Sequence, residues 1–213
     1  MSLKVARGDR IDFVGPKGAG KTTLLKMLIK TLEPDEGTVV HGSKLELSLF
    51  DQNRDQLDDK MSLWESLTGD PDMRVSGKAD QVMVRGNPRH VVGYLKDFLF
   101  DEARARADVG SLSGGEKARL LLAKIMARES NLLVLDEPTN DLDMETLDLL
   151  QVLGCEYDGT GLLGFYFGGF LGRWVYTRIA MAGYGSAPVY AGRSSFRLYP
   201  CLAPTDTDGV ARR

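Results

Sequence analysis

The chain has 213 residues, enough for one domain of ordinary size or one domain with an appendage. Its 27 basic and 30 acidic residues give a net charge of −3, which argues against a protein whose overall field attracts nucleic acid. Two cysteines are too few for a disulfide framework, and neither a secretion signal nor an apolar run of the roughly 20 residues that cross a bilayer is present. We therefore expect a cytoplasmic protein with no membrane insertion.

Two short strands, at residues 3–5 and 11–14, are expected to open the chain around a turn at Gly8 and Asp9. The second strand contains Asp12, which is unusual in a strand that is buried on both faces. Asp12 must therefore find a partner, lie near a sheet edge, or cost stability.

A glycine-rich segment, residues 15–23, follows the second strand and is named here the phosphate loop. It fits the pattern G-x-x-x-x-G-K-S/T, whose glycines let backbone N–H groups surround a phosphate at the N-terminus of a helix. Lys21 would contact the β- and γ-phosphates, and the Thr22 hydroxyl would help to hold Mg²⁺. The alternative is a glycine-rich turn that binds nothing. The predicted nucleotide-binding residues are Gly15, Pro16, Lys17, Gly18, Ala19, Gly20, Lys21, Thr22 and Thr23.

The next elements are predicted from hydrophobic periodicity and turn residues. Leucines at helical spacing predict a helix from the loop to residue 32, stopped by Pro34, and alternation predicts an antiparallel hairpin of residues 38–41 and 45–50. Further elements are expected as a short helix capped by Ser62 and ending at Leu67, a strand at 82–84, and a helix that begins at Asn87 and Pro88. His90 lies in that last helix without a second histidine or cysteine nearby, and we interpret it as a surface or packing residue.

Two acidic residues follow an apolar run in the second half of the chain. Residues 132–135 predict a central parallel strand, which ends at Asp136 and Glu137. In a nucleotide triphosphatase the first acid holds the metal and its water shell, and the second orients or deprotonates the attacking water. The neighbouring elements are a strong helix after residues 111–116 and a helix at 144–153, and the extended pieces beyond it are expected at 162–163, 175–181 and 189–190.

Four motifs in order resemble an ATP-binding-cassette ATPase: the phosphate loop, the signature LSGGE at 112–116, LLVLDE at 132–137 and PTNDLD at 138–143. The amino-acid sequences of these motifs are similar to those of the soluble ABC-F group, and the chain most resembles the second cassette of Uup-type proteins. The resemblance implies an α/β fold: a RecA-like P-loop core with an antiparallel β subdomain and an α-helical subdomain that carries the signature. It covers residues 3–160 well, so we expect a cassette core at 1–160 with a truncated N-terminal strand. Residues 161–213 are expected to be an altered, glycine-rich end with a disordered tail from about 200.

The resemblance also assigns roles. Glu137 would be the general base, Gln52 would contact the metal or the water, and the Mg²⁺ site would comprise Thr22, Gln52 and Asp136. In this family two cassettes pack head to tail, so Ser113, Gly114 and Gly115 would face ATP held by a second cassette. The second cassette would be another copy in a homodimer or a cassette on another chain. Asp143, at the end of the PTNDLD motif, belongs to the segment called the D-loop in this family and would lie on the same interface.

Three positions depart from the family pattern. Lys17 stands where the family has asparagine, and the adenine-stacking aromatic that the family has upstream of Leu3 is missing. Tyr166 occupies the place of the switch histidine; a phenol with a pKa near 10 can donate one hydrogen bond but does not offer the pair of donor and acceptor nitrogens that imidazole has near neutral pH.

Three functions therefore compete. The first is Mg-ATP hydrolysis to ADP and phosphate by an ABC-F cassette that acts on the ribosome or on branched nucleic acid, the partner being implied by the family alone. The second is an ATP-binding module with impaired hydrolysis, and the third is the ATPase subunit of a transporter. A basic face for nucleic acid is conceivable, but charged residues on helices are usually solvated surface, and we favour that interpretation for Arg85, Arg89, Arg104, Arg106, Lys117, Arg119, Lys124 and Arg128.

Overall fold

A parallel sheet forms the centre of the computed structural model, which describes residues 2–50, 57–138, 142–165 and 174–181. Its strand order is β2-β5-β6-β1-β7, and all four neighbouring pairs are parallel. The strands are β1 (Arg10–Val14), β2 (Leu47–Phe50), β5 (Leu132–Asp136), β6 (Thr160–Phe165) and β7 (Thr177–Ala180). The predicted α/β class with a parallel core is thus confirmed.

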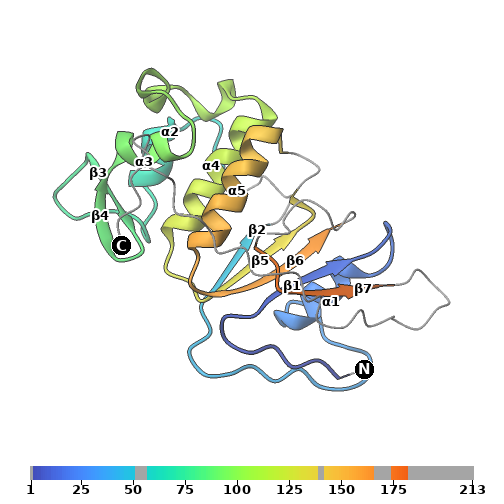
Figure 1. Cartoon of the computed structure of the whole chain (residues 1–213). Helices are drawn as coiled ribbons and strands as arrows, with labels where there is room; N and C mark the ends of the chain where they lie inside the picture. Colours follow the sequence, from blue (N-terminus) through green and yellow to red (C-terminus); the bar gives the residue numbers. More distant parts are fainter. Residues whose placement is uncertain (1, 51–56, 139–141, 166–173, 182–213) are drawn as a thin grey trace, which may run out of the picture.

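Helices cover both faces of this sheet (Figure 1). Helix α1 (Lys21–Leu28) packs through Leu25 on the face that includes Val134 and Leu162. Helices α4 (Gly114–Ala127) and α5 (Met144–Glu156) lie side by side on the other face, against Leu133, Leu135 and Leu163. Neighbouring residues of β5 and β6 therefore point into two different cores, which explains the consecutive apolar residues at 132–135 and 162–163.

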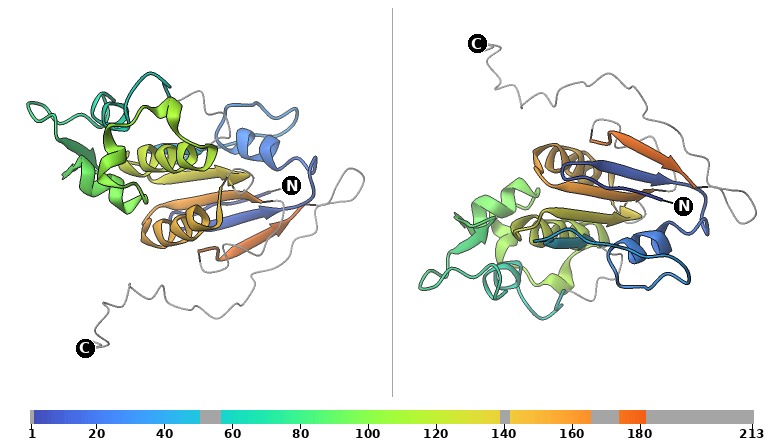
Figure 2. Two further views of the ribbon diagram at one scale, coloured as in Figure 1. Left: turned by 90° about the horizontal axis from the view of Figure 1, so that it is seen from above. Right: turned by 90° about the horizontal axis from the view of Figure 1, so that it is seen from below.

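The remaining elements form a mainly helical part, away from α1 and β7 (Figure 2). It contains α2 (Leu63–Thr68), α3 (Val91–Asp97), two short 3-10 turns at Glu102–Arg106 and Val109–Ser111, and the antiparallel pair β3 (Gln81–Val84) and β4 (Asn87–His90). The predicted helix capped by Ser62 is confirmed, and its cap is a complete capping box with Glu65.

The predicted antiparallel hairpin of residues 38–41 and 45–50 is wrong. Strand β2 pairs in parallel with β5, from Leu47 opposite Leu132 to Phe50 opposite Leu135, and no strand is described at 38–41. That segment is tied elsewhere, because the His41 ring lies 2.7 Å from the carbonyl oxygen of Leu28 on α1 and Arg7 donates to the carbonyl of Ser43. Residues 3–5, also predicted as a strand, have no sheet partner.

The helix expected from Asn87 begins four residues later. Arg85 and Gly86 both have positive φ, 45° and 77°, the conformation of a type I′ turn that folds β4 back onto β3. Pro88 is accommodated because it lies in a two-stranded ribbon, where an absent N–H costs little. His90 then caps α3, its Nδ1 accepting the N–H of Val92 at 3.2 Å.

Helix α1 is shorter than predicted, since it ends at Leu28 and the chain turns at Lys30 with φ 61°. The helix at 144–153 is confirmed and extends to Glu156, while strands expected at 162–163 and 175–181 appear as β6 and β7. Residues 189–190 lie outside the described residues, as does the tail from 200.

Asp12 finds a partner across the β1–β7 pair. Its side chain is 2% exposed, and the Nε of Arg178 donates to Oδ2 at 3.1 Å. Burial nevertheless outweighs the arginine and raises the pKa of Asp12 to about 6.

Candidate nucleotide site

The phosphate loop connects the end of β1 to the start of α1. Gly18 and Gly20 have φ of 84° and 87°, which side-chain-bearing residues rarely adopt, and Gly20 is the N-cap of α1. A Cβ on Gly15 would lie 2.5 Å from the carbonyl oxygen of Met181, so only glycine fits there. Because Gly20 has no side chain to cap the helix, the first-turn N–H groups suit a bound anion.

Lys21 begins α1 and turns its side chain back beneath the loop. It is 4% exposed, and its Nζ donates to the carbonyl oxygens of Gly15 at 2.8 Å and Pro16 at 3.1 Å. The same Nζ lies 3.0 Å from Oε1 of Glu137. An ammonium held in this way can exchange its carboxylate contact for phosphate oxygens without leaving the loop.

Asp136 and Glu137 stand at the carboxyl end of β5, next to the loop. A Cβ on Gly164 of β6 would be 3.2 Å from Oδ1 of Asp136 and 3.7 Å from Cβ of Lys21, so this glycine lets the two groups approach. Glu137 has φ 50°, a left-handed conformation that costs a non-glycine residue about 1 kcal/mol. Its N–H donates to the carbonyl of Gly164 at 2.9 Å, and this bond helps to hold the strained backbone that directs the side chain to Lys21.

The oxygen atoms near the loop fit Mg²⁺. Asp136 offers a carboxylate, Thr22 offers a hydroxyl in the first turn of α1, and hard oxygen donors are what Mg²⁺ prefers. Among the described residues no group of three or more His, Cys, Asp or Glu side chains gathers as a metal cage. A site with few protein ligands suits a magnesium ion that is held mainly through substrate phosphates and water. Gln52, predicted as a further ligand, lies outside the described residues.

The signature forms a second surface, built on the N-terminus of α4. Ser113 caps α4, its Oγ accepting the N–H of Glu116 at 3.2 Å while the Glu116 carboxylate accepts the N–H of Ser113 at 2.8 Å. Gly114 and Gly115 form the first turn of α4. Asp143 caps the adjacent α5, and a Cβ on Gly115 would lie 3.0 Å from its Oδ2. The structure thus joins Gly115 to Asp143, and it joins the loop to Asp136 and Glu137.

The carboxylates of the signature surface are held in their charged forms. Hydrogen bonds from Ser113 lower the pKa of Glu116, and hydrogen bonds from Thr146 lower the pKa of Asp143. The positive charge of Arg119 on α4 contributes to both shifts.

Two residues close to these surfaces were missed from the sequence. Gly164 carries a usable signal, because a glycine inside an apolar strand often marks a close backbone or side-chain approach. Thr146 carries the weaker signal of a hydroxyl three residues after a capping aspartate.

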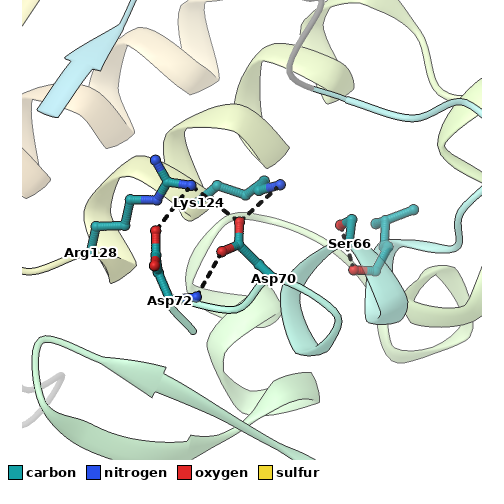
Figure 3. A network of polar contacts seen from close by, with 6 residues as sticks. Ser66, Asp70, Asp72, Lys124 and Arg128 are labelled. Carbon is teal, nitrogen blue, oxygen red and sulfur yellow. Dashed lines mark hydrogen bonds and ion pairs between the residues drawn. The ribbon is translucent and has the colours of Figure 1, made fainter. Parts of the chain in front are cut away.

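Most of the basic residues that were candidates for a nucleic-acid face are paired with neighbouring acids. Lys124 and Arg128 of α4 both reach Asp70, at 3.4 and 3.2 Å, and Arg128 also approaches Asp72 (Figure 3). The remaining contacts of this kind are Arg89 with Asp97, Arg104 with Glu116 and Lys117 with Asp59, whereas Arg85 and Arg106 lie over the rings of Tyr157 and Trp64. Paired charges of this kind favour ordinary surface over a nucleic-acid face.

Comparisons with known proteins agree with this geometry. The chain matches the family model described as ABC transporter over residues 1–140. It is 51% identical over 185 residues to ATP-binding protein Uup of Caulobacter vibrioides, covering 87% of this chain and 29% of the relative. It is 37% identical over 180 residues to the energy-dependent translational throttle protein EttA of Haemophilus influenzae, covering 84% of this chain and 30% of the relative. The chain therefore spans less than a third of the length of either relative.

A solved structure shares the fold. The dimeric post-hydrolysis state of the ATP-binding cassette MJ0796, bound to ADP and Pi, superposes with a TM-score of 0.64, covering 88% of each chain. The sequences are 20% identical, so this likeness concerns the fold alone.

Proposed function

The chain belongs to the ABC transporter family of ATP-binding cassettes, and from that premise we propose that it binds Mg-ATP and hydrolyses it to ADP and phosphate as one half of a head-to-tail pair of cassettes. The observation that carries the proposal is the ion pair of 3.0 Å between Lys21 and Glu137 beneath the phosphate loop. It brings together a phosphate-binding cation and a carboxylate able to accept a proton from water.

The backbone of the phosphate loop binds the phosphates, and Lys21 exchanges its contact with Glu137 for the β- and γ-phosphate oxygens. This exchange releases the Glu137 carboxylate, which then orients the attacking water and accepts its proton. Asp136 and Thr22 would hold Mg²⁺, with Gln52 as the third expected ligand. When bound, the ion would supply positive charge that stabilises the charge developing on the phosphate oxygens.

Each cassette of the pair would contribute its signature to the nucleotide that is bound by the phosphate loop of the other cassette. Ser113, Gly114 and Gly115 present the N-terminus of α4, which complements negative charge, to the nucleotide held by the other cassette. Asp143 lies on the same surface, within contact of Gly115, and is assigned to the same interface.

The wider setting is proposed from the family. Residues 1–160 are proposed as the cassette core and 161–213 as its altered end, which contributes most of β6 and all of β7 to the sheet. None of the helices in the described residues is both long and apolar enough to traverse a membrane. We propose a cytoplasmic ABC-F protein, and the relative named as a translational throttle favours the ribosome over branched nucleic acid as its target.

An ATP-binding module with impaired hydrolysis is the second candidate. The observation that favours it is Tyr166 in the place of the switch histidine, a position outside the described residues. In that case nucleotide would act as a conformational ligand and would be turned over very slowly. The third candidate, a transporter subunit, would be recognised by copurification with a membrane protein.

Phosphate release distinguishes the first two candidates. Purified protein, at concentrations that allow pairing, should release phosphate from Mg-ATP, and Glu137→Gln should release almost none while still binding ATP. Equal release by the two proteins would reject hydrolysis through Glu137. If turnover is very low and Tyr166→His raises it strongly, the binding module is the better description.

A further inference from the structure

The signature and the D-loop aspartate touch each other within one chain, at the adjacent N-termini of α4 and α5 (Figure 1). The approach is close, because a Cβ on Gly115 would be only 3.0 Å from Oδ2 of Asp143, so any residue with a side chain would crowd the carboxylate. The Asp143 carboxylate and the first turn of α4 are therefore close neighbours on one surface.

One buried side chain holds that carboxylate. Thr146 is 0% exposed, and both its backbone N–H and its Oγ1 donate to Oδ1 of Asp143, at 2.8 and 2.5 Å. Two donors on one oxygen hold Oδ1 in place, and Oδ2 is the atom that approaches Gly115. The hydroxyl bond is short, as expected when the acceptor is ionised.

Charge supports the same arrangement. The hydrogen bonds from Thr146 are the largest causes that lower the pKa of Asp143, and Arg119 of α4 lowers it further. Asp143 therefore stays ionised and bound to Thr146 near neutral pH.

We propose that Thr146 is a positioning residue: it holds the Asp143 carboxylate beside the first turn of α4, so that Asp143 and the signature form one surface that a second cassette meets as a unit. This inference rests on the proposed function, because the surface acts only when it faces nucleotide on another cassette. Thr146 itself touches no reacting atom. Its effect should therefore fall on turnover in the pair, and binding of nucleotide to the chain's own phosphate loop should not change.

The test compares three variants of the full chain. Thr146→Val keeps the branched shape and removes the hydroxyl, Thr146→Ser keeps the hydroxyl, and Thr160→Val is the matched control. Thr160 is also a buried threonine, 7% exposed, and its hydroxyl accepts the N–H of Gly8 at 3.0 Å, at the end of β6 away from the phosphate loop.

Thr146→Val should lower kcat for phosphate release about tenfold, the size expected for the loss of one hydrogen bond to a charged group. Its affinity for a fluorescent ATP analogue should match that of the unaltered chain, Thr146→Ser should restore kcat, and Thr160→Val should retain it. A wild-type kcat in Thr146→Val, an equal fall in its nucleotide affinity, or failure of Thr146→Ser to restore kcat would each overturn the inference. Absence of phosphate release from the unaltered chain would reject the proposed hydrolysis, and the inference with it.

Discussion

The phosphate loop and the signature surface are each expected to contact ATP, the loop its own nucleotide and the signature surface the nucleotide of a second cassette, yet they are built by different means. Backbone conformation shapes the loop, through Gly18 and Gly20 at positive φ and through Gly15 against the carbonyl of Met181. Side-chain caps shape the signature surface, through Ser113 on α4 and Asp143 on α5. The loop therefore depends on the absence of side chains, and the signature surface depends on particular polar groups.

The carboxylates near the two surfaces also differ. Burial raises the pKa of Asp12, on the strand that leads to the loop, whereas hydrogen bonds lower the pKa of Glu116 and Asp143 at the signature. Rising pH should weaken the strand beneath the loop, and falling pH should weaken the signature surface. The contrast can be tested by altering one group on each side.

The largest effect is expected from Lys21→Ala. The substitution removes a buried cation in contact with the carbonyls of Gly15 and Pro16 and with Glu137, so bound phosphates would lose a charge-assisted partner. Affinity for a fluorescent ATP analogue should fall about 100-fold or more, measured by equilibrium titration. Lys26→Ala, at an exposed position on the same helix, serves as the control and should bind normally. Unchanged binding by Lys21→Ala would remove the loop from the site.

The sequence predicted the strand, loop and helix order of β1 and α1 and the strand β5, because the determinants of these elements are local. The G-x-x-x-x-G-K-S/T pattern needs only neighbouring residues, and an apolar run ending in Asp136 and Glu137 can be read directly as a central strand. The close approach of Gly164 to Asp136 could not be predicted from the sequence, because it depends on β5 and β6 being neighbours in the sheet. The same holds for Met181 against Gly15, which are 166 positions apart in the chain.

Two predicted elements were wrong for different reasons. Asn87 and Pro88 are typical of a helix start, but the turn at Arg85 and Gly86 determined the pairing and made them part of β4. Residues 45–50 alternate as an exposed hairpin strand would, yet β2 found its partner 85 residues away along the chain, with Leu47 opposite Leu132. Tertiary partners decided the outcome in β2, and local turn chemistry decided it in β4.

A smaller effect is expected from the titration of Asp12. Its folded pKa of about 6 lies above the unfolded value of 3.8, so the folded state binds more protons between these values. The stability that Asp12 contributes is thus fully present below the unfolded pKa and is lost as pH rises through about 6. Relative to Asp12→Asn, the free energy of unfolding of the unaltered chain should fall by about 2 kcal/mol between about pH 4.5 and 7.5. Urea denaturation at both pH values measures it, and a constant difference would contradict the raised pKa.

The smallest effect, on stability, is expected from the two matching capping boxes. Ser113 caps α4 with Glu116, and Ser62 caps α2 with Glu65, so Ser113→Ala and Ser62→Ala remove the same hydrogen bonds from two helix N-termini. Each should cost about 1 kcal/mol of unfolding free energy, measured by urea denaturation. Only Ser113→Ala should also lower phosphate release, because its hydroxyl belongs to the surface assigned to nucleotide on the second cassette. Equal phosphate release by the two variants would mean that Ser113 does no more than cap its helix. The N-terminus of α4 would then have no role in hydrolysis through Ser113 that the N-terminus of α2 lacks.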